Sequence, residues 1–177
     1  VTIPDSVTSI GFCAFYNCKS LTSVTIPDSV TSISESAFED CKSLTSATIP
    51  YSVTSIGDYA YHGCYFTSEN FVNNSNVELD YSSKPTIVDT DAGGFCIKDN
   101  ELVNMRPTYA IGEVTIPNSV TSIDDDAFDS CINLKSVTIP DSVTSIGDYA
   151  FKSCTNLKSI IVLTPDCKFG SYIVEEN

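Results

Sequence analysis

The apolar residues of this chain recur with a period of 23 residues. The string V-T-I-P-D-S-V-T-S-I begins at Val1, Val24 and Val137, and near copies begin at Ala47 and Val114. Five such copies exceed chance by far, so the chain is a repeat protein. The two groups of copies differ in phase, because the step from 47 to 114 is two residues short of three periods. We therefore predict two arrays of repeats separated by a non-repetitive segment.

Each repeat predicts a short strand, a turn and a compact apolar segment. In the second copy Val24 and Ile26 lie two residues apart, so they face one side of a strand and Thr25 faces the other. Pro27 ends that strand because proline cannot donate to a sheet. The spacing Ala-Phe-x-x-Cys-x-x-Leu that follows favours one or two turns of helix. A single unit has too little apolar surface to fold alone, so we predict that the units stack into a solenoid.

One full unit has the following order: Cys18-x-x-Leu21-x-x-Val24-x-Ile26-x-x-x-Val30-x-x-Ile33-x-x-x-Ala37-Phe38. This order resembles the 23-residue leucine-rich repeat of the BspA-like (treponemal) type, over residues 1–69 and 114–162. The resemblance implies a leucine-rich-repeat solenoid of the α/β horseshoe type, mostly β. Its concave side would carry a parallel sheet of short strands, and its convex side 3₁₀ or α turns. It also implies a module of a cell-surface or secreted protein, since family members include adhesins and binders of host proteins.

The decay of the repeat in its third copy sets the predicted domain organisation. Residues 1–69 are expected to form a first array of three repeats. Residues 70–93 are rich in Asn, Ser and Asp and are expected to form an insertion loop. Residues 94–177 should hold a hairpin-type variant rung around Asp99-Asn100, two further repeats and a C-terminal rung or cap. We favour one continuous solenoid, because separate arrays would expose apolar rungs.

The chain has eight cysteines, so disulfide bonds and metal binding have to be considered. Five share one repeat position among apolar neighbours: Cys18, Cys41, Cys64, Cys131 and Cys154. Free cysteine behaves there as a small buried hydrophobe, and parallel side chains in a ladder disfavour disulfides. No pair has the C-x₂-C spacing of a zinc site. We predict a ladder of buried thiols, no metal and no cofactor. The redox state stays open for three others, Cys13, Cys96 and Cys167.

Charge and hydropathy limit the partners. Nine basic and 23 acidic residues give a net charge of −14, which excludes a nucleic-acid partner, since such binding rests on basic phosphate contacts. No run approaches the roughly 18 apolar residues of a membrane-spanning helix, so no membrane span is expected.

The sequence holds little catalytic chemistry. The only histidine, His62, lies at a freely varying repeat position two residues before Cys64, so a Cys–His or Ser–His nucleophile is disfavoured. We predict that the protein is not an enzyme. Asp89-Thr90-Asp91 resembles the start of a calcium loop, but Gly93 stands where that loop needs an oxygen ligand and Asn100 where it needs glutamate. Ca²⁺ binding by the insertion stays open.

The predicted concave face carries hydroxyl groups and varies at few positions. Five threonines should point to it: Thr2, Thr25, Thr48, Thr115 and Thr138. Tyr51 and Asn118 replace an aspartate that the other three copies carry. Because the rungs are otherwise nearly identical, specific recognition should use these two variable positions, the convex turns and the insertion, on a rigid scaffold. The candidate binding residues are Thr25, Thr48, Tyr51, Thr115, Asn118 and Thr138. The expected partner is a protein or a glycan. The alternative function is a structural spacer or targeting arm of a larger secreted protein.

The first rung has an open edge in this sequence, because Val1 and Ile3 begin in mid-repeat with no capping segment. Unpaired edges recruit further strands. We therefore expect upstream repeats or another chain to cover this edge, and predict end-to-end self-association through the N-terminal rung.

Overall fold

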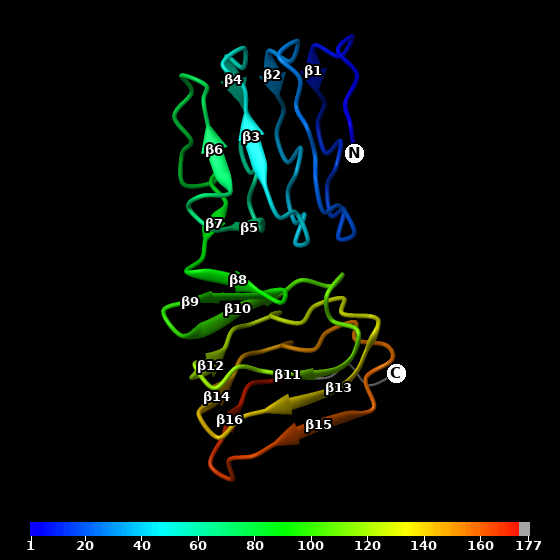
Figure 1. Cartoon of the computed structure of the whole chain (residues 1–177), viewed down its shortest axis with the longest axis vertical. Helices are drawn as coiled ribbons and strands as arrows, with labels where there is room; N and C mark the ends of the chain where they lie inside the picture. The colour runs from blue at the N-terminus through cyan, green and yellow to red at the C-terminus, as the bar shows by residue number, and fades with distance from the viewer. Residues whose placement is uncertain (174–177) are drawn as a thin grey trace. The chain divides into compact units, whose positions relative to one another are not determined.

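Short strands stacked rung upon rung form both parts of the chain (Figure 1). The computed structural model describes residues 1–173, apart from the side chains of residues 90–92. The chain divides into two compact units, Val1–Ile87 and Val88–Asn177. Each is a mostly β leucine-rich-repeat solenoid, and the predicted fold class is confirmed.

Seven strands belong to the first unit: β1 (Ser9–Ile10), β2 (Ser32–Ile33), β3 (Ala47–Ile49), β4 (Ser55–Ile56), β5 (Tyr65–Phe66), β6 (Phe71–Asn73) and β7 (Thr86–Ile87). The parallel sheet β1-β2-β4 pairs each residue with its equivalent in the next repeat, so Ile10, Ile33 and Ile56 lie side by side. An isolated parallel bridge joins Thr2 to Thr25 in the same register. The sequence period is therefore the rung-to-rung register.

Much of the segment 70–93, expected as an insertion loop, adds strands to this stack. Strand β6 pairs in parallel with β3, and β7 pairs in parallel with β5. The partner of Ala47 is Phe71, one position beyond a full repeat. Leu79 is buried in the same core. The extra residue and the loss of the usual proline hide this rung from a search for the sequence period.

Nine strands belong to the second unit: β8 (Thr90–Ala92), β9 (Phe95–Lys98), β10 (Glu101–Met105), β11 (Gly112–Thr115), β12 (Ser122–Ile123), β13 (Leu134–Ile139), β14 (Ser145–Ile146), β15 (Ser159–Val162) and β16 (Lys168–Phe169). The antiparallel hairpin β9–β10 turns at Asp99 and Asn100, whose φ angles of 52° and 63° suit a tight hairpin turn. Parallel sheets β10-β12-β14-β16 and β11-β13-β15 follow. Val174 and residues 175–177, expected in a C-terminal cap, lie outside the described residues.

The apolar segment after each turn is a series of single turns and forms no continuous helix within residues 1–173. Its alternate N–H groups donate to the next rung: Ser36 to Asp58, Phe38 to Ala60 and Asp40 to His62, each at 2.9 Å. A helix would need those donors for its own carbonyls. Two residues per rung are left-handed, such as Ser36 and Asp40 with φ of 55° and 57°. Bonds between rungs therefore replace the predicted helical turns.

Like residues form ladders through the core. The rings of Phe15, Phe38 and Tyr61 stack with centroids 5.1 and 5.2 Å apart, and Phe128 stacks on Phe151 at 4.7 Å. These distances are close to the spacing of paired strands, about 4.8 Å. One aromatic ring per rung therefore packs face to face along each stack.

The predicted ladder of buried thiols is confirmed at four of its five positions, Cys41, Cys64, Cys131 and Cys154, while Cys18 in the first rung is half-buried. All eight cysteines lie within the described residues and are free thiols. The buried thiols of Cys41 and Cys64 donate to the carbonyls of Phe15 and Phe38 in the preceding rung, both at 3.0 Å. Burial raises the pKa of the Cys41 thiol to about 12. The Cys41 thiol is therefore protonated and unreactive. The pKa of Cys154 is lowered instead, by hydrogen bonding with Cys131. The hydrogen bonds of Cys41 and Cys64 also join successive rungs.

Close rung packing predicts the effect of a methyl group at Gly57. A Cβ there would overlap the backbone of Glu35 and Ser34, which cannot swing aside. We expect Gly57→Ala to lower the free energy of unfolding by about 1–3 kcal/mol, the usual cost of overpacking. Gly11→Ala is the matched control, because Gly11 has the same repeat position and nothing within 4 Å of its Cβ direction. Urea denaturation measures both; an equal loss in the two variants would contradict close rung packing.

A substitution at Tyr61 is expected to raise the free energy of unfolding instead of lowering it. Tyr61 stands in the phenylalanine ladder, fully buried, and its hydroxyl has no hydrogen-bond partner among the described residues. An unpaired buried hydroxyl costs free energy, so Tyr61→Phe should raise the free energy of unfolding by about 1 kcal/mol. Phe38→Tyr, which buries a hydroxyl in the neighbouring rung, should lower it. A less stable Tyr61→Phe protein in urea denaturation would show instead that this hydroxyl is satisfied.

Candidate ligand-binding site

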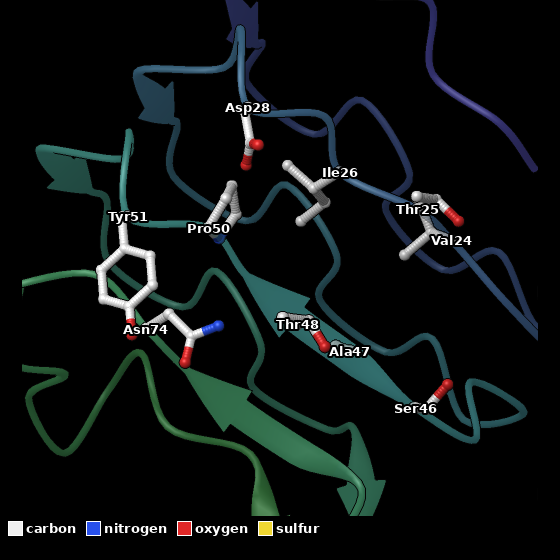
Figure 2. Close-up of a pocket in the computed structure, with 10 residues that line it drawn as sticks. All are labelled: Val24, Thr25, Ile26, Asp28, Ser46, Ala47, Thr48, Pro50, Tyr51 and Asn74. Atoms are coloured by element: carbon white, nitrogen blue, oxygen red, sulfur yellow. The ribbon is translucent and has the colours of Figure 1, made fainter.

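Three successive rungs of the first unit form an open hollow of about 500 Å³, which we call the Tyr51 hollow (Figure 2). Its lining residues are Val24, Thr25, Ile26, Asp28, Ser46, Ala47, Thr48, Pro50, Tyr51 and Asn74. Figure 2 shows Tyr51 and Asn74 at one side of the hollow and Thr25 and Ser46 at the other. Its volume lies within the range of small-molecule sites, about 300–1,000 Å³.

Strand alternation places the hydroxyl groups of the hollow. In β3 the side chains of Ala47 and Ile49 are buried and that of Thr48 is exposed. Thr25 lies one rung earlier in the equivalent place, exposed between buried Val24 and Ile26. Successive side chains of a strand point to opposite faces, so the same alternation that fills the core also lines the hollow with threonines.

The turn after β3 holds the aromatic side chain. Pro50 is buried and its carbonyl accepts the N–H of Val53 at 3.2 Å, which closes the turn. Tyr51, inside this turn, is 77% exposed. The preceding rung has the same turn, closed by a 3.0 Å bond from Val30 to Pro27, and it carries Asp28 in place of a tyrosine. An aromatic ring and a carboxylate therefore occupy equivalent places on neighbouring rungs.

Asn74 comes from the rung that the sequence period does not reveal. It directly follows β6, and its backbone N–H donates at 2.9 Å to the carbonyl of Ile49, the last residue of the neighbouring strand β3. The next turn is fixed by Asn73, whose side-chain oxygen accepts from the backbone N–H of Ser75 at 3.0 Å and whose amide donates to Val77 at 2.9 Å. A half-buried amide thus lies where the three preceding rungs carry Pro4, Pro27 and Pro50.

The hollow offers hydrogen bonds and one apolar ring face. Thr25, Thr48 and Ser46 supply hydroxyls that both donate and accept, and Asn74 supplies an amide that does the same. Asp28 is the only charged residue in the lining. In the described part of the chain no group of three or more His, Cys, Asp or Glu could hold a metal ion. This set of groups is suited to binding a polar ligand by hydrogen bonds and ring contact.

Three of the six residues predicted from sequence, Thr25, Thr48 and Tyr51, line the Tyr51 hollow. The other three belong to the second unit. There Thr115 of β11 pairs with Thr138 of β13, and Asn118 is exposed in the turn that follows β11. The structure thus divides the predicted set between the two units.

Two lining residues, Asp28 and Asn74, escaped the sequence-based choice. Asp28 matches the commonest residue of its repeat position, so nothing in the sequence singles it out. Asn74 replaces a proline, which becomes visible only once the longer step between β3 and β6 is known. The calcium alternative needs the side chains of residues 90–92, and these lie outside the described part of the structure.

No helix in residues 1–173 has the length and apolar character that crossing a membrane requires.

Comparison with known proteins matches the repeat pattern to a described family. The profile of the BspA type leucine rich repeat region matches six copies, over residues 1–83 and 106–175. A search of curated protein sequences finds no match.

Several solved structures are similar to the chain. A leucine rich cell surface protein from Faecalibacterium prausnitzii is 28% identical over 92% of this chain and 59% of its own, with a TM-score of 0.41. The T. pallidum leucine rich repeat protein is 25% identical over 98% and 73%, with a TM-score of 0.36. The pneumococcal vaccine antigen PcpA is 19% identical over 98% and 47%, with a TM-score of 0.47. The chain thus spans less than two thirds of the first and third of these proteins.

The profile covers most of the chain, over residues whose short strands the structure stacks rung upon rung. The chain belongs to the BspA-type leucine-rich repeat family.

Proposed function

We propose that this chain is a non-catalytic interaction module of a cell-surface or secreted protein, adhesin-like, which binds a protein or glycan partner at the Tyr51 hollow. One observation carries the proposal. On a surface built from nearly identical rungs, two departures from the repeat, Tyr51 in place of aspartate and Asn74 in place of proline, line the same hollow. Membership of a repeat family that presents extended binding surfaces supports it.

The chemistry of the hollow favours binding over catalysis. Its lining holds no histidine, cysteine or lysine, and a single carboxylate, Asp28. His62 packs edge-on against Tyr59, with ring centroids 5.6 Å apart, and is not in the lining. A nucleophile next to a base, or a pair of carboxylates, would be needed for hydrolytic chemistry.

A structural spacer is the second candidate, and the regularity of the stack favours it. Side-chain bonds repeat from rung to rung: the Ser29 hydroxyl donates to Val7 and the Ser52 hydroxyl to Val30, both at 2.7 Å. Such a ladder makes each unit stiff, as a spacer or targeting arm of a larger protein requires. The two functions differ in whether the Tyr51 hollow is needed.

Binding to surfaces tests the first function. We expect the labelled chain to bind at least one member of a panel of extracellular-matrix proteins, glycans and epithelial cells, and Tyr51→Asp to weaken that binding about tenfold or more, as loss of an aromatic anchor does. Tyr81→Asp is the matched control, because Tyr81 is a 97% exposed tyrosine of the same unit outside the lining. Equal binding by the two variants would remove the hollow from the function and favour the spacer.

We also propose that copies of this chain associate end to end through the first rung. A second hollow of about 280 Å³, with Val1, Ile3, Val7 and Phe15 in its lining, lies at this edge. In the second rung the N–H of Thr31 donates to the carbonyl of Thr8 in the first rung. The N–H of Thr8 is the equivalent donor of the first rung, and a rung of a second copy would supply its acceptor.

Sedimentation measures this association. The weight-average mass of the chain should rise with concentration up to about 1 mM, a range in which weak contacts form. Ser9→Lys, which puts a charge on the edge strand β1, should keep it monomeric, because lysine at an edge blocks strand pairing. Ser32→Lys at the same place in the interior strand β2 is the control. A wild-type chain that stays monomeric throughout would exclude the association.

A further inference from the structure

We infer that the Tyr51 hollow takes a neutral saccharide, with a sugar ring stacked on Tyr51. This inference rests on the proposed function and names the class of its ligand. The residues that carry it are Tyr51, Asp28 and Asn74, with the threonine hydroxyls between them.

The aromatic ring is placed for contact with a ligand. Tyr51 is 77% exposed and lies directly after buried Pro50, so its backbone is held while its ring faces solvent. An aromatic ring has an apolar face and, in tyrosine, a polar end. The C–H groups on one face of a pyranose ring are apolar, while its hydroxyls point outward round the rim. A tyrosine at the border of a polar hollow matches both parts of such a ring.

The polar lining matches the rim of a sugar. A carboxylate accepts two hydrogen bonds, and an amide accepts with its oxygen while it donates with its nitrogen. Asp28 and Asn74 present these groups on either side of the rung that carries Tyr51. Neighbouring sugar hydroxyls can both donate and accept, so each of these planar groups can engage two of them. The hydroxyls of Thr25 and Thr48 add further partners of the same kind.

Charge selects a neutral sugar over an acidic one. The only charged group of the lining is the Asp28 carboxylate. Residues 1–87 hold three lysines against nine acidic residues, a net charge of −6. A sialylated or sulfated chain would approach against this negative potential and find no cation in the hollow.

A glycan array followed by calorimetry tests the inference. The probes are neutral oligosaccharides ending in glucose, galactose, mannose or N-acetylglucosamine, beside sialylated and sulfated ones. We expect binding to neutral probes only. Tyr51→Phe should keep the affinity within about threefold, because the ring face remains, and Tyr51→Asp should lower it about tenfold or more, the worth of one stacked aromatic contact. Tyr81→Asp, with an unchanged hollow, should bind like the wild type.

The outcomes separate this inference from the proposed function. If no neutral oligosaccharide binds but a matrix protein or a cell still requires Tyr51, the saccharide is excluded and the interaction module stands. Neutral-sugar binding that Tyr51→Asp leaves unchanged would also overturn the inference, because the sugar would bind elsewhere. If no probe, cell or protein depends on Tyr51, both proposals fail. Urea denaturation of each variant confirms that the fold is intact.

Discussion

Backbone hydrogen bonds between successive rungs are the constraint on which the rest of this structure depends. The strands bond in parallel with an offset of one repeat, and on the opposite side alternate N–H groups such as that of Phe38 donate to the next rung. Between repeats that keep this offset each side chain lies on its equivalent, so the core becomes ladders of isoleucine, stacked aromatic rings and thiols. It also brings backbones so close that Gly57 has no room for a methyl group. The period in the sequence and the packing in the core are thus two descriptions of one hydrogen-bond pattern.

A scaffold of this kind makes surface departures informative. The threonines on the strand face follow from alternation alone, since the residue between two buried strand residues must face outward. The presence of Tyr51 and Asn74 on this surface is not explained by strand alternation. They belong to successive rungs and are far apart in sequence, yet the stack brings them to one hollow together with Asp28. The repeat supplies a uniform polar floor, and the departures supply the ring and the amide that give the hollow its chemistry.

The sequence was sufficient for the register and the core ladders, because both follow from the period. It was insufficient where the controlling contacts lie between rungs. The left-handed residues at one turn position belong to four residue types and include no glycine: Cys13, Ser36, Tyr59, Asp126, Tyr149 and Tyr172. Their conformation is set by bonds to the next rung, so local propensity predicted helical turns instead. The rung that contains β6 was hidden for a related reason: its step exceeds the period by one position, and Phe71 and Leu79 fill the core without keeping the consensus letters. Asp28 could not be chosen from the sequence, because it matches the repeat and lines the hollow only by virtue of the residues around it.

Two tyrosines of the same rung show how function and stability separate. Tyr61 departs from the phenylalanine ladder inside the core, where its hydroxyl is buried without a partner among the described residues and costs stability. Tyr51 departs from the aspartate of its turn position, where the aspartate side chain would favour the turn and tyrosine does not. Its ring is mostly in solvent, so the fold gains little from it. A large apolar ring that contributes little to the fold, fixed beside exposed hydrogen-bonding groups, is best accounted for by contacts with a second molecule.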